Sequence, residues 1–276
     1  MITENAYAKL NLALAVGGRA DNGYHYVDSL MQTVSLYDTV SVEKGEGICL
    51  SCSDARLPTD GRNLAVKAAN AFFAHTGILG GARIHIEKRI PEGAGLGGGS
   101  ADGGAVLRAL DKLYGTRLDS HTLCRIAAPL GADVPFCTLG GTARATGFGE
   151  ALEVLEDREL CFVLLFGKVS LSTPRMYAAL DSGVNCYPDT GELFEAWAAD
   201  PVAALRRWGG NSFLPLSAAE DASVKSNISQ LCALGGAYAC ISGKGPTVFA
   251  LFESEQAAMR AARDSGGVFC KSTGRL

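Results

Sequence analysis

The sequence predicts a fold of the α+β class, in which strands and helices are both abundant, and two kinds of pattern support that prediction. Stretches 7–16 and 82–90 alternate apolar and polar residues, which is typical of half-buried strands. Segments 63–75 and 106–114 repeat their apolar residues at helical spacing instead. In the first strand, polar Lys9 and Asn11 are expected to lie on an open face.

The pattern of predicted strands and helices changes in the second half of the chain, and this change predicts a second domain. The apolar stretch 160–166 is typical of a buried strand, and an Ala-rich helical region containing both tryptophans follows it. The sequence AYACISGKGPTVFALF, residues 237–252, predicts a hairpin of strands about a Gly-rich turn, followed by one more helix and a short strand. We therefore expect an N-terminal domain of residues 1–155 and a C-terminal domain of residues 156–276.

Composition and charge limit the classes of partner. Of the 276 residues, 47% are hydrophobic and 20% charged, which supports a large core and argues against bulk disorder. The net charge is −4 and no run of Lys or Arg occurs, so neither nucleic acid nor a membrane is the expected partner. Because no apolar run is long enough to span a bilayer and no secretory signal pattern opens the sequence, the expected location is cytoplasmic.

Cysteine spacing does not favour a zinc site. Cys49 and Cys52 form a CxxC pair in a strand-like stretch, but no second Cys or His pair lies near them in the sequence. A structural zinc ion needs four ligands, so we interpret the nine cysteines as reduced residues that pack as small hydrophobes.

The segment PEGAGLGGGSADGG lies between a predicted strand and a predicted helix, and its glycines point to an anion site. Bare backbone can approach an anion closely, and the N-terminus of the helix adds a partial positive charge. In a protein without a basic patch, this arrangement predicts a cradle for a polyphosphate. The expected ATP-binding residues are Pro91, Glu92, Gly93, Ala94, Gly95, Leu96, Gly97, Gly98, Gly99, Ser100 and Ala101.

Three other interpretations of this segment are less favoured. Gly93, Gly95 and Gly98 match the dinucleotide fingerprint GxGxxG, but that fingerprint needs a following parallel strand, and here a second helical segment follows. The phosphate loop GxxxxGK[ST] does not occur, because Gly243-Lys244 is followed by another glycine. A simple flexible turn is a poor explanation, because ordering so many glycines costs conformational entropy.

The segment PEGAGLGGGSAD resembles the phosphate loop of the GHMP kinase superfamily. Residues 6–25, AYAKLNLALAVGGRADNGYH, and the turn GADVPF of residues 131–136 are similar to segments of those GHMP kinases whose acceptor is 4-diphosphocytidyl-2-C-methyl-D-erythritol. ISGKGPTVFALF, residues 241–252, resembles the third, Gly-rich motif of the superfamily. These segments occur in the same order as in the family and span nearly the whole chain.

The resemblance implies a reaction and a fold. ATP, with Mg²⁺, would phosphorylate the 2-hydroxyl of this cytidine diphosphate-linked polyol in the non-mevalonate isoprenoid route. The N-terminal domain would be ribosomal-protein-S5-domain-2-like and the C-terminal domain ferredoxin-like, with both substrates in the cleft between them. The protein would be a monomer or weak homodimer. The alternatives are a homoserine- or mevalonate-type GHMP kinase, against which GYH and Tyr177 argue, and a catalytically inactive relative.

By the same resemblance, Asp133 is the general base that accepts the proton of the attacking hydroxyl, a role that suits a carboxylate. The alternative is an aspartate that only hydrogen-bonds its own turn. Lys9 would neighbour Asp133, keep it ionised and offset charge on the transferring phosphoryl group. Asn11 shares the face of Lys9 and is expected to contact substrate. The presence of both Lys9 and Asp133 argues against an inactive relative.

The expected acceptor contacts are aromatic. Tyr24 and His25 match the cytidine-binding GYH segment, where a ring can stack on cytosine and an imidazole can bond its edge. Tyr177 would stack on the other face of the base, and Thr173 would be a weaker contact. Ser100 is expected either to cap the helix after the loop or to bind Mg²⁺.

Three residues depart from the family pattern. Glu92 places an acidic residue in the phosphate loop, where it would repel phosphate unless it points away. Asn22 is an extra residue before GYH, which loosens the expected turn. Lys244 replaces the small residue usual in the third motif, so it either adds a phosphate contact or is solvated.

Overall fold

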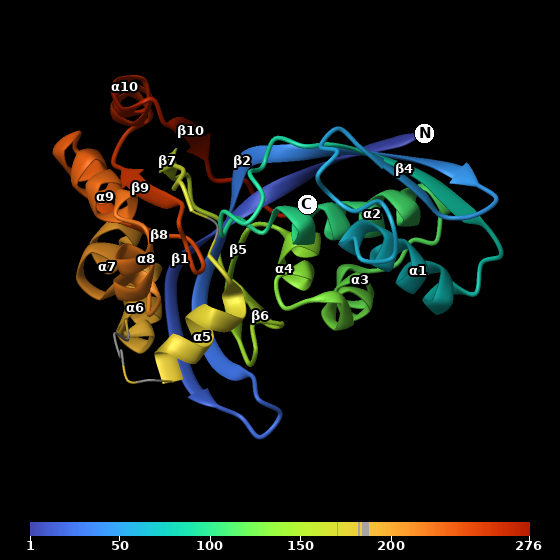
Figure 1. Ribbon diagram of the computed structural model, residues 1–276, viewed down its shortest axis with the longest axis horizontal. Coiled ribbons are helices and arrows are strands. Elements are labelled where there is room, and N and C mark those ends of the chain that lie inside the picture. Colours follow the sequence, from blue (N-terminus) through green and yellow to red (C-terminus); the bar gives the residue numbers. More distant parts are fainter. Residues whose placement is uncertain (170, 182, 184–187) are drawn as a thin grey trace.

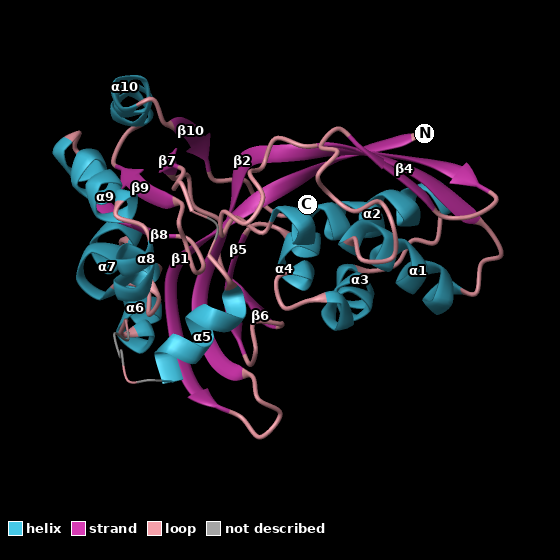
Figure 2. Cartoon of the chain, in the orientation of Figure 1, coloured by secondary structure: helices cyan, strands magenta, loops and turns pink. Residues whose placement is uncertain are grey.

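The computed structural model describes residues 1–169, 171–181, 183 and 188–276, and two β-sheets organise it (Figures 1 and 2). The first sheet has the strand order β3-β4-β2-β5-β6, and β1 pairs with β2 off this path. Its β3–β4 pair is parallel and its other pairs are antiparallel. The strands are β1 (Ile2–Arg19), β2 (His25–Gly45), β3 (Cys49–Cys52), β4 (Gly81–Glu87), β5 (Thr142–Thr146) and β6 (Ala151–Val154).

The first α-helices of the chain gather beside this sheet on one side of the molecule (Figure 1). They are α1 (Leu64–Thr76), α2 (Gly98–Tyr114), α3 (Ser120–Ala127) and α4 (Val134–Leu139). The side chains of Asn63 and Asp119 cap α1 and α3, as expected where a short polar residue precedes an apolar repeat. Helix α2 contacts β1, β2, α1 and α4, so the helix that follows the phosphate loop is central to this half.

The second sheet is fully antiparallel, with the order β10-β7-β9-β8. Its strands are β7 (Cys161–Leu165), β8 (Tyr238–Ile241), β9 (Val248–Phe252) and β10 (Val268–Lys271). The accompanying helices are α5 (Thr173–Asp181), α6 (Thr190–Trp197), α7 (Pro201–Trp208), α8 (Leu214–Glu220), α9 (Ser223–Ala233) and α10 (Glu255–Ser265). The mixed helix-and-sheet class is confirmed, and so is the predicted hairpin, which is β8–β9.

Strand β1 connects the two halves of the molecule. The amide of Leu14 donates to the carbonyl of Gly210 (2.9 Å), and the amide of Ser212 donates to that of Leu14 (2.9 Å). The C-terminal residues also return to the first half, where the amide of Thr273 donates to the carbonyl of Thr33 (2.9 Å). Residues of the first strand and of the C-terminus thus bond to the opposite half of the molecule. The boundary between two domains after residue 155 stays a prediction.

The expectation that Lys9 and Asn11 lie on an open strand face is wrong. Both residues are buried, with 4% and 5% of their surface exposed. The phosphate loop covers this face, since the amide of Lys9 donates to the carbonyl of Leu96 (3.0 Å). The hydroxyl of Ser242 covers it from the second half by accepting from the amide of Asn11 (3.2 Å). Alternation alone could not reveal this second layer, because its residues are distant in sequence.

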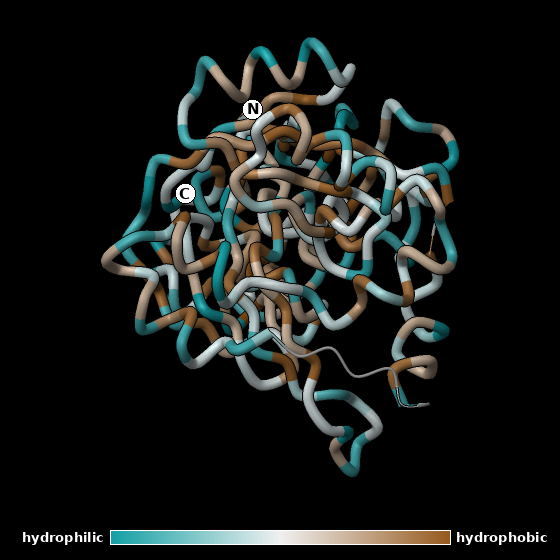
Figure 3. The backbone as a smooth tube through the Cα atoms, turned by 90° about the vertical axis from the view of Figure 1, so that its left-hand side faces the viewer, coloured by the Kyte–Doolittle hydropathy of each residue, from teal (hydrophilic) through white to brown (hydrophobic). Residues whose placement is uncertain are grey.

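Apolar residues concentrate on the interior strands and hydrophilic residues on the outer loops (Figure 3). The largest fully buried side chains include Phe72, Phe136, Phe162 and Phe249, two from each half. Across the described residues, no helix combines the length and the apolar character that crossing a bilayer requires.

Candidate active site

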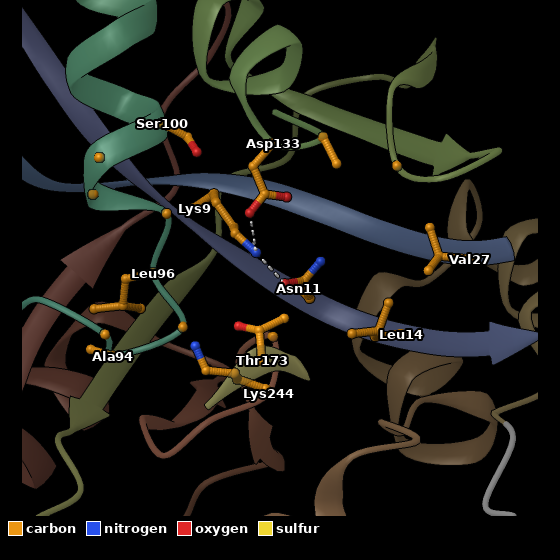
Figure 4. Close-up of a pocket in the computed structure, with 18 of the residues that line it drawn as sticks. Lys9, Asn11, Leu14, Val27, Ala94, Leu96, Ser100, Asp133, Thr173 and Lys244 are labelled. Carbon is orange, nitrogen blue, oxygen red and sulfur yellow. Dashed lines mark hydrogen bonds and ion pairs between the residues drawn. The ribbon is translucent and has the colours of Figure 1, made fainter. Parts of the chain in front are cut away.

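A cavity of about 950 Å³ lies where the two halves meet. It is lined by the phosphate loop, β1, the hairpin between β1 and β2, the N-terminus of α4, helix α5 and the β8–β9 turn. Figure 4 shows some of these residues, including Lys9, Asp133 and Lys244. Almost every site residue expected from the sequence lines this cavity. The exception is Ala101, which is fully buried and whose amide donates to the carbonyl of Gly97 (2.8 Å).

The phosphate loop is packed so tightly that a side chain at either of two positions would clash with neighbouring atoms. A Cβ at Gly95 would lie 2.2 Å from the carbonyl oxygen of Ser242, and one at Gly97 would lie 2.9 Å from Cγ of Lys9. Both glycines have left-handed φ angles, +80° and +70°. Gly97 is the N-cap of α2, so the free amides of the first helical turn lie at the cavity. This geometry suits a bound phosphate.

Glu92 lies on the rim of the cavity with its side chain exposed to water. It contributes to the raised pKa of Arg56, although the hydrogen bond and ion pair with Asp54 are the larger causes. A solvated carboxylate is strongly screened, so Glu92 does not conflict with an anion held deeper in the loop.

Lys9 and Asp133 meet at the centre of the cavity (Figure 4). Lys9 Nζ is 3.3 Å from Asp133 Oδ2, and the lysine side chain is 5% exposed whereas that of the aspartate is 36% exposed. Lys9 Nζ also donates to Asn11 Oδ1, and Asn11 Nδ2 donates to Ser29 Oγ (2.8 Å). Asp133 occupies the N-cap position of α4 but makes no capping hydrogen bond. Its carboxylate faces Lys9 instead of its own turn.

The hairpin between β1 and β2 brings aromatic residues to the other end of the cavity. The ring of His25 stacks on that of Tyr177 from α5, with 5.1 Å between ring centres. Burial, with a smaller effect of Asp133, raises the pKa of Tyr177 to about 12. Tyr24 is 67% exposed and packs against Phe148. The structure therefore brings His25 and Tyr177 together and places Tyr24 at the rim.

The extra residue Asn22 fits the hairpin turn. Its side-chain oxygen accepts from the amide of Tyr24 (3.0 Å), a local bond that asparagine commonly makes in turns. The amide of Ala20 donates to the carbonyl of Tyr24 (2.7 Å) and closes the turn.

On α5, Thr173 is the exposed first residue of the helix and also lines the cavity.

Comparisons with known proteins agree with this geometry. The family model of the GHMP kinases N terminal domain matches residues 63–141, and that of GHMP kinases C terminal matches residues 206–265. A protein of Clostridium botulinum named 4-diphosphocytidyl-2-C-methyl-D-erythritol kinase is 38% identical over 251 residues, 90% of each chain. One of the same name from Caldicellulosiruptor saccharolyticus is 38% identical over 96% of this chain and 93% of its own.

The chain belongs to the 4-diphosphocytidyl-2-C-methyl-D-erythritol kinase family. A crystal structure of a kinase of this family superposes with a TM-score of 0.81 and 34% identity, covering 99% of this chain and all of its own. A crystal structure of a homoserine kinase from Cytophaga hutchinsonii superposes with a TM-score of 0.73. It is 19% identical, and the match covers 98% of this chain and 95% of that kinase. This second likeness shows the shared fold alone. The resemblance and the two-domain GHMP kinase fold are thus confirmed, and the dinucleotide-binding alternative is wrong.

Asp181 also belongs to the candidate site, although no motif in the sequence pointed to it. Asp181 Oδ1 lies 2.7 Å from Nε2 of the buried His25. Asp181 follows Tyr177 by four residues, so both residues lie on one face of α5. That spacing was the available signal, but only the fold reveals that this face meets the hairpin.

A buried charge cluster at the start of the phosphate loop was also missed. Lys88 Nζ pairs with the carboxylates of Asp38, on β2, and Asp102, on α2, at 2.7 Å from the latter. The amide of Ile90 donates to Asp38 (2.8 Å), so the cluster fastens the loop to both elements. Burial raises the pKa of the Asp102 carboxyl to about 7 against the opposing charge of Lys88. Oδ1 of Asp102 has no hydrogen-bond partner among the described residues.

The expectation that Ser100 caps α2 is wrong. Gly97 is the N-cap and Ser100 is the third residue of the helix, where its hydroxyl lines the cavity. In the described residues, no cluster of three or more His, Cys, Asp or Glu side chains could hold a metal ion by itself. Oxygen donors at the cavity do fit magnesium, since that ion is commonly held by one or two protein oxygens together with substrate phosphates.

Proposed function

We propose that this protein is an ATP-dependent kinase that phosphorylates the 2-hydroxyl of 4-diphosphocytidyl-2-C-methyl-D-erythritol, in the non-mevalonate route to isoprenoid precursors. The observation that carries the proposal is a single cavity that joins three parts. These are a backbone cradle for an anion, a Lys9–Asp133 pair and an aromatic surface formed by His25 and Tyr177. Two relatives that are 38% identical over 90% and 96% of this chain carry the name of this kinase.

In the proposed reaction, the cradle binds the phosphates of ATP through free amides at the start of α2. Asp133 accepts the proton of the acceptor hydroxyl as its oxygen attacks the γ-phosphorus in line. Lys9, buried beside Asp133, pairs with that carboxylate and offsets negative charge on the phosphoryl oxygens. Asn11 holds the lysine ammonium in place through its side-chain oxygen.

We propose that the cytosine of the acceptor is bound at the hairpin end of the cavity. His25 and Tyr177 offer stacked aromatic surface there, and Tyr24 adds a partly exposed ring at the rim. Thr173 provides a hydroxyl in the same cavity. This arrangement would place the polyol of the acceptor near the catalytic pair and its base against the aromatic rings.

Magnesium is proposed as the metal that accompanies ATP. Ser100 would be the protein donor, since its hydroxyl lines the cavity in the first turn of α2 and makes no other side-chain hydrogen bond in the described part of the chain. When bound, the ion would neutralise charge on the phosphate oxygens. The protein itself contributes the amides, Lys9 and Asp133.

The acceptor assignment is tested by incubating the purified protein with ATP and Mg²⁺ and measuring ADP release with three acceptors. Turnover with the cytidylated methylerythritol, and none above background with homoserine or mevalonate, is the expected result. Preference for homoserine or mevalonate would reject the acceptor assignment while leaving the kinase activity. An absence of turnover with all three, by folded protein that binds ATP, would favour the inactive relative.

We further propose that the protein works in the cytoplasm, where its phosphoryl donor ATP is plentiful. A net charge of −4 supports a role without nucleic acid. We expect a monomer or weak homodimer, which sedimentation velocity over a range of protein concentrations would measure.

A further inference from the structure

The turn between β8 and β9 presents Lys244 to the cavity from the second half of the molecule (Figure 4). Three hydrogen bonds hold this turn against its neighbours. Ser242 Oγ donates to the carbonyl of Gly95 in the phosphate loop (2.8 Å) and accepts from the amide of Asn11 (3.2 Å). Asn211 Nδ2 donates to the carbonyl of Gly243 (2.8 Å). Lys244 is therefore mounted on a segment tied directly to the phosphate loop.

The charge of Lys244 lacks the compensation that the other cavity cations have. Among the described residues, the Lys and Arg side chains that line the cavity belong to Lys9, Arg19, Lys88 and Lys244. The first pairs with Asp133, the second with Asp181, and the third with two aspartates. Lys244 alone has no carboxylate of the described chain within ion-pair distance.

The position of Lys244 makes this unpaired charge costly. Its side chain is half-buried, and burial lowers its pKa from the ordinary value. The positive charge of Lys9 lowers the pKa further, and Asp133, already paired with Lys9, only partly opposes this. A partly desolvated ammonium next to another cation is stabilised when an anion approaches both. The free protein thus holds a charged site whose counter-ion has to come from a ligand.

We propose that Lys244 binds the oligophosphate group of a nucleotide in this cavity and acts with Lys9 as a second cation at the phosphoryl-transfer site. The inference rests on the proposed kinase function and adds a residue to it. Two nucleotides of that reaction carry such a group, namely ATP and the cytidine diphosphate-linked acceptor. A lysine ammonium suits either, since it binds phosphate as a compact point charge.

The test compares binding by calorimetry for the wild type, Lys244→Met and Lys244→Arg. Methionine keeps a long flexible side chain without the charge, whereas arginine restores the charge. Lys225→Met removes an exposed lysine of α9 and is the matched control. The probes are ADP, CDP, inorganic tripolyphosphate, and adenosine and cytidine as nucleosides without phosphate. Thermal melts establish that each variant is folded, and Lys244→Gln replaces Lys244→Met if the latter does not fold.

Lys244→Met is expected to weaken the binding of tripolyphosphate and of one of the two nucleotides by about tenfold, the low end of what one hydrogen bond to a charged group contributes. Arginine should restore most of this affinity, and nucleoside binding should not change. A loss confined to ADP assigns Lys244 to ATP, and a loss confined to CDP assigns it to the acceptor. Equal affinities of the wild type and Lys244→Met for ADP, CDP and tripolyphosphate would overturn the inference.

These binding measurements need no turnover, so the inference and the proposed function can fail separately. If no acceptor is phosphorylated but the Lys244→Met loss occurs, the kinase assignment is wrong and the phosphate site stands. If turnover occurs and binding is unaffected by Lys244→Met, the kinase assignment stands and Lys244 has no part in binding phosphate.

Discussion

Replacing Gly95 by alanine tests whether the phosphate cradle depends on bare backbone packed against the second half of the molecule. The new Cβ would lie 2.2 Å from the carbonyl oxygen of Ser242, and the residue would have to keep a φ of +80°. The left-handed conformation alone costs about 1–2 kcal/mol, and forcing an extra carbon into a packed region adds about 1–3 kcal/mol. The loop is expected to relieve this strain by moving away from the β8–β9 turn.

A displaced loop no longer aims its amides at one point, so ATP affinity should fall. Taking about 2 kcal/mol as the low end of the strain, the expected loss is about 30-fold in Kd. Gly115→Ala is the matched control, since Gly115 caps the other end of α2 with a φ of +65° and a Cβ added there would meet nothing within 4 Å. It carries the backbone strain without the clash.

Calorimetric titration with ATP, together with thermal unfolding, measures both effects. Gly115→Ala should lower stability by about 1–2 kcal/mol and leave ATP affinity within about twofold of the wild type. Gly95→Ala should lower ATP affinity in protein that is still folded at the assay temperature. Wild-type ATP affinity in Gly95→Ala would refute the claim that this close packing shapes the cradle.

Two further changes test the parts that were found only in the fold. Asp181→Ala removes the hydrogen-bond partner of His25, so the KM for the cytidylated acceptor should rise about tenfold. The kcat and the KM for ATP should stay unchanged. An unchanged acceptor KM in steady-state kinetics would argue against this contact. The pKa of the Asp102 carboxyl is raised from 3.8 to about 7 in the folded protein. Between these two pH values the native state therefore binds more protons than the unfolded state. The free energy of unfolding should fall as pH rises from about 4 to about 7. Asp102→Asn should flatten this part of a denaturant-unfolding pH series, and an unaltered slope would contradict the assignment.

Much of the fold is accessible from the sequence because local patterns carry it. The alternation in β4 and the helical stripe of α2 identify their elements, and the glycines between them locate the cradle. The wrong prediction for the strand that carries Lys9 has a different origin, which is packing between distant segments. Alternation predicts an open face for Lys9 because nothing near it in sequence shows that the phosphate loop and Ser242 cover that face.

The site residues divide in the same way. Lys9 and Asp133 belong to motifs far apart in the sequence, and the structure brings them within 3.3 Å. Asp181 and the Lys88 cluster carry no motif, since a single carboxylate on a helix is normally solvated. Their roles depend on what each side chain meets across the cavity, and a pattern of residue types does not contain that information. Ser100 is not the cap because the helix starts earlier, at glycines.

The claim that Asp133 is the base of a phosphoryl transfer is tested most directly by one single-turnover measurement. Enzyme in excess is mixed with radiolabelled ATP and the cytidylated methylerythritol, and label transfer is followed for the wild type and Asp133→Asn. If Asp133 is the base, Asp133→Asn slows transfer by about 10²- to 10⁴-fold, the usual contribution of a general base, while ATP still binds. Transfer at near the wild-type rate by Asp133→Asn would contradict it.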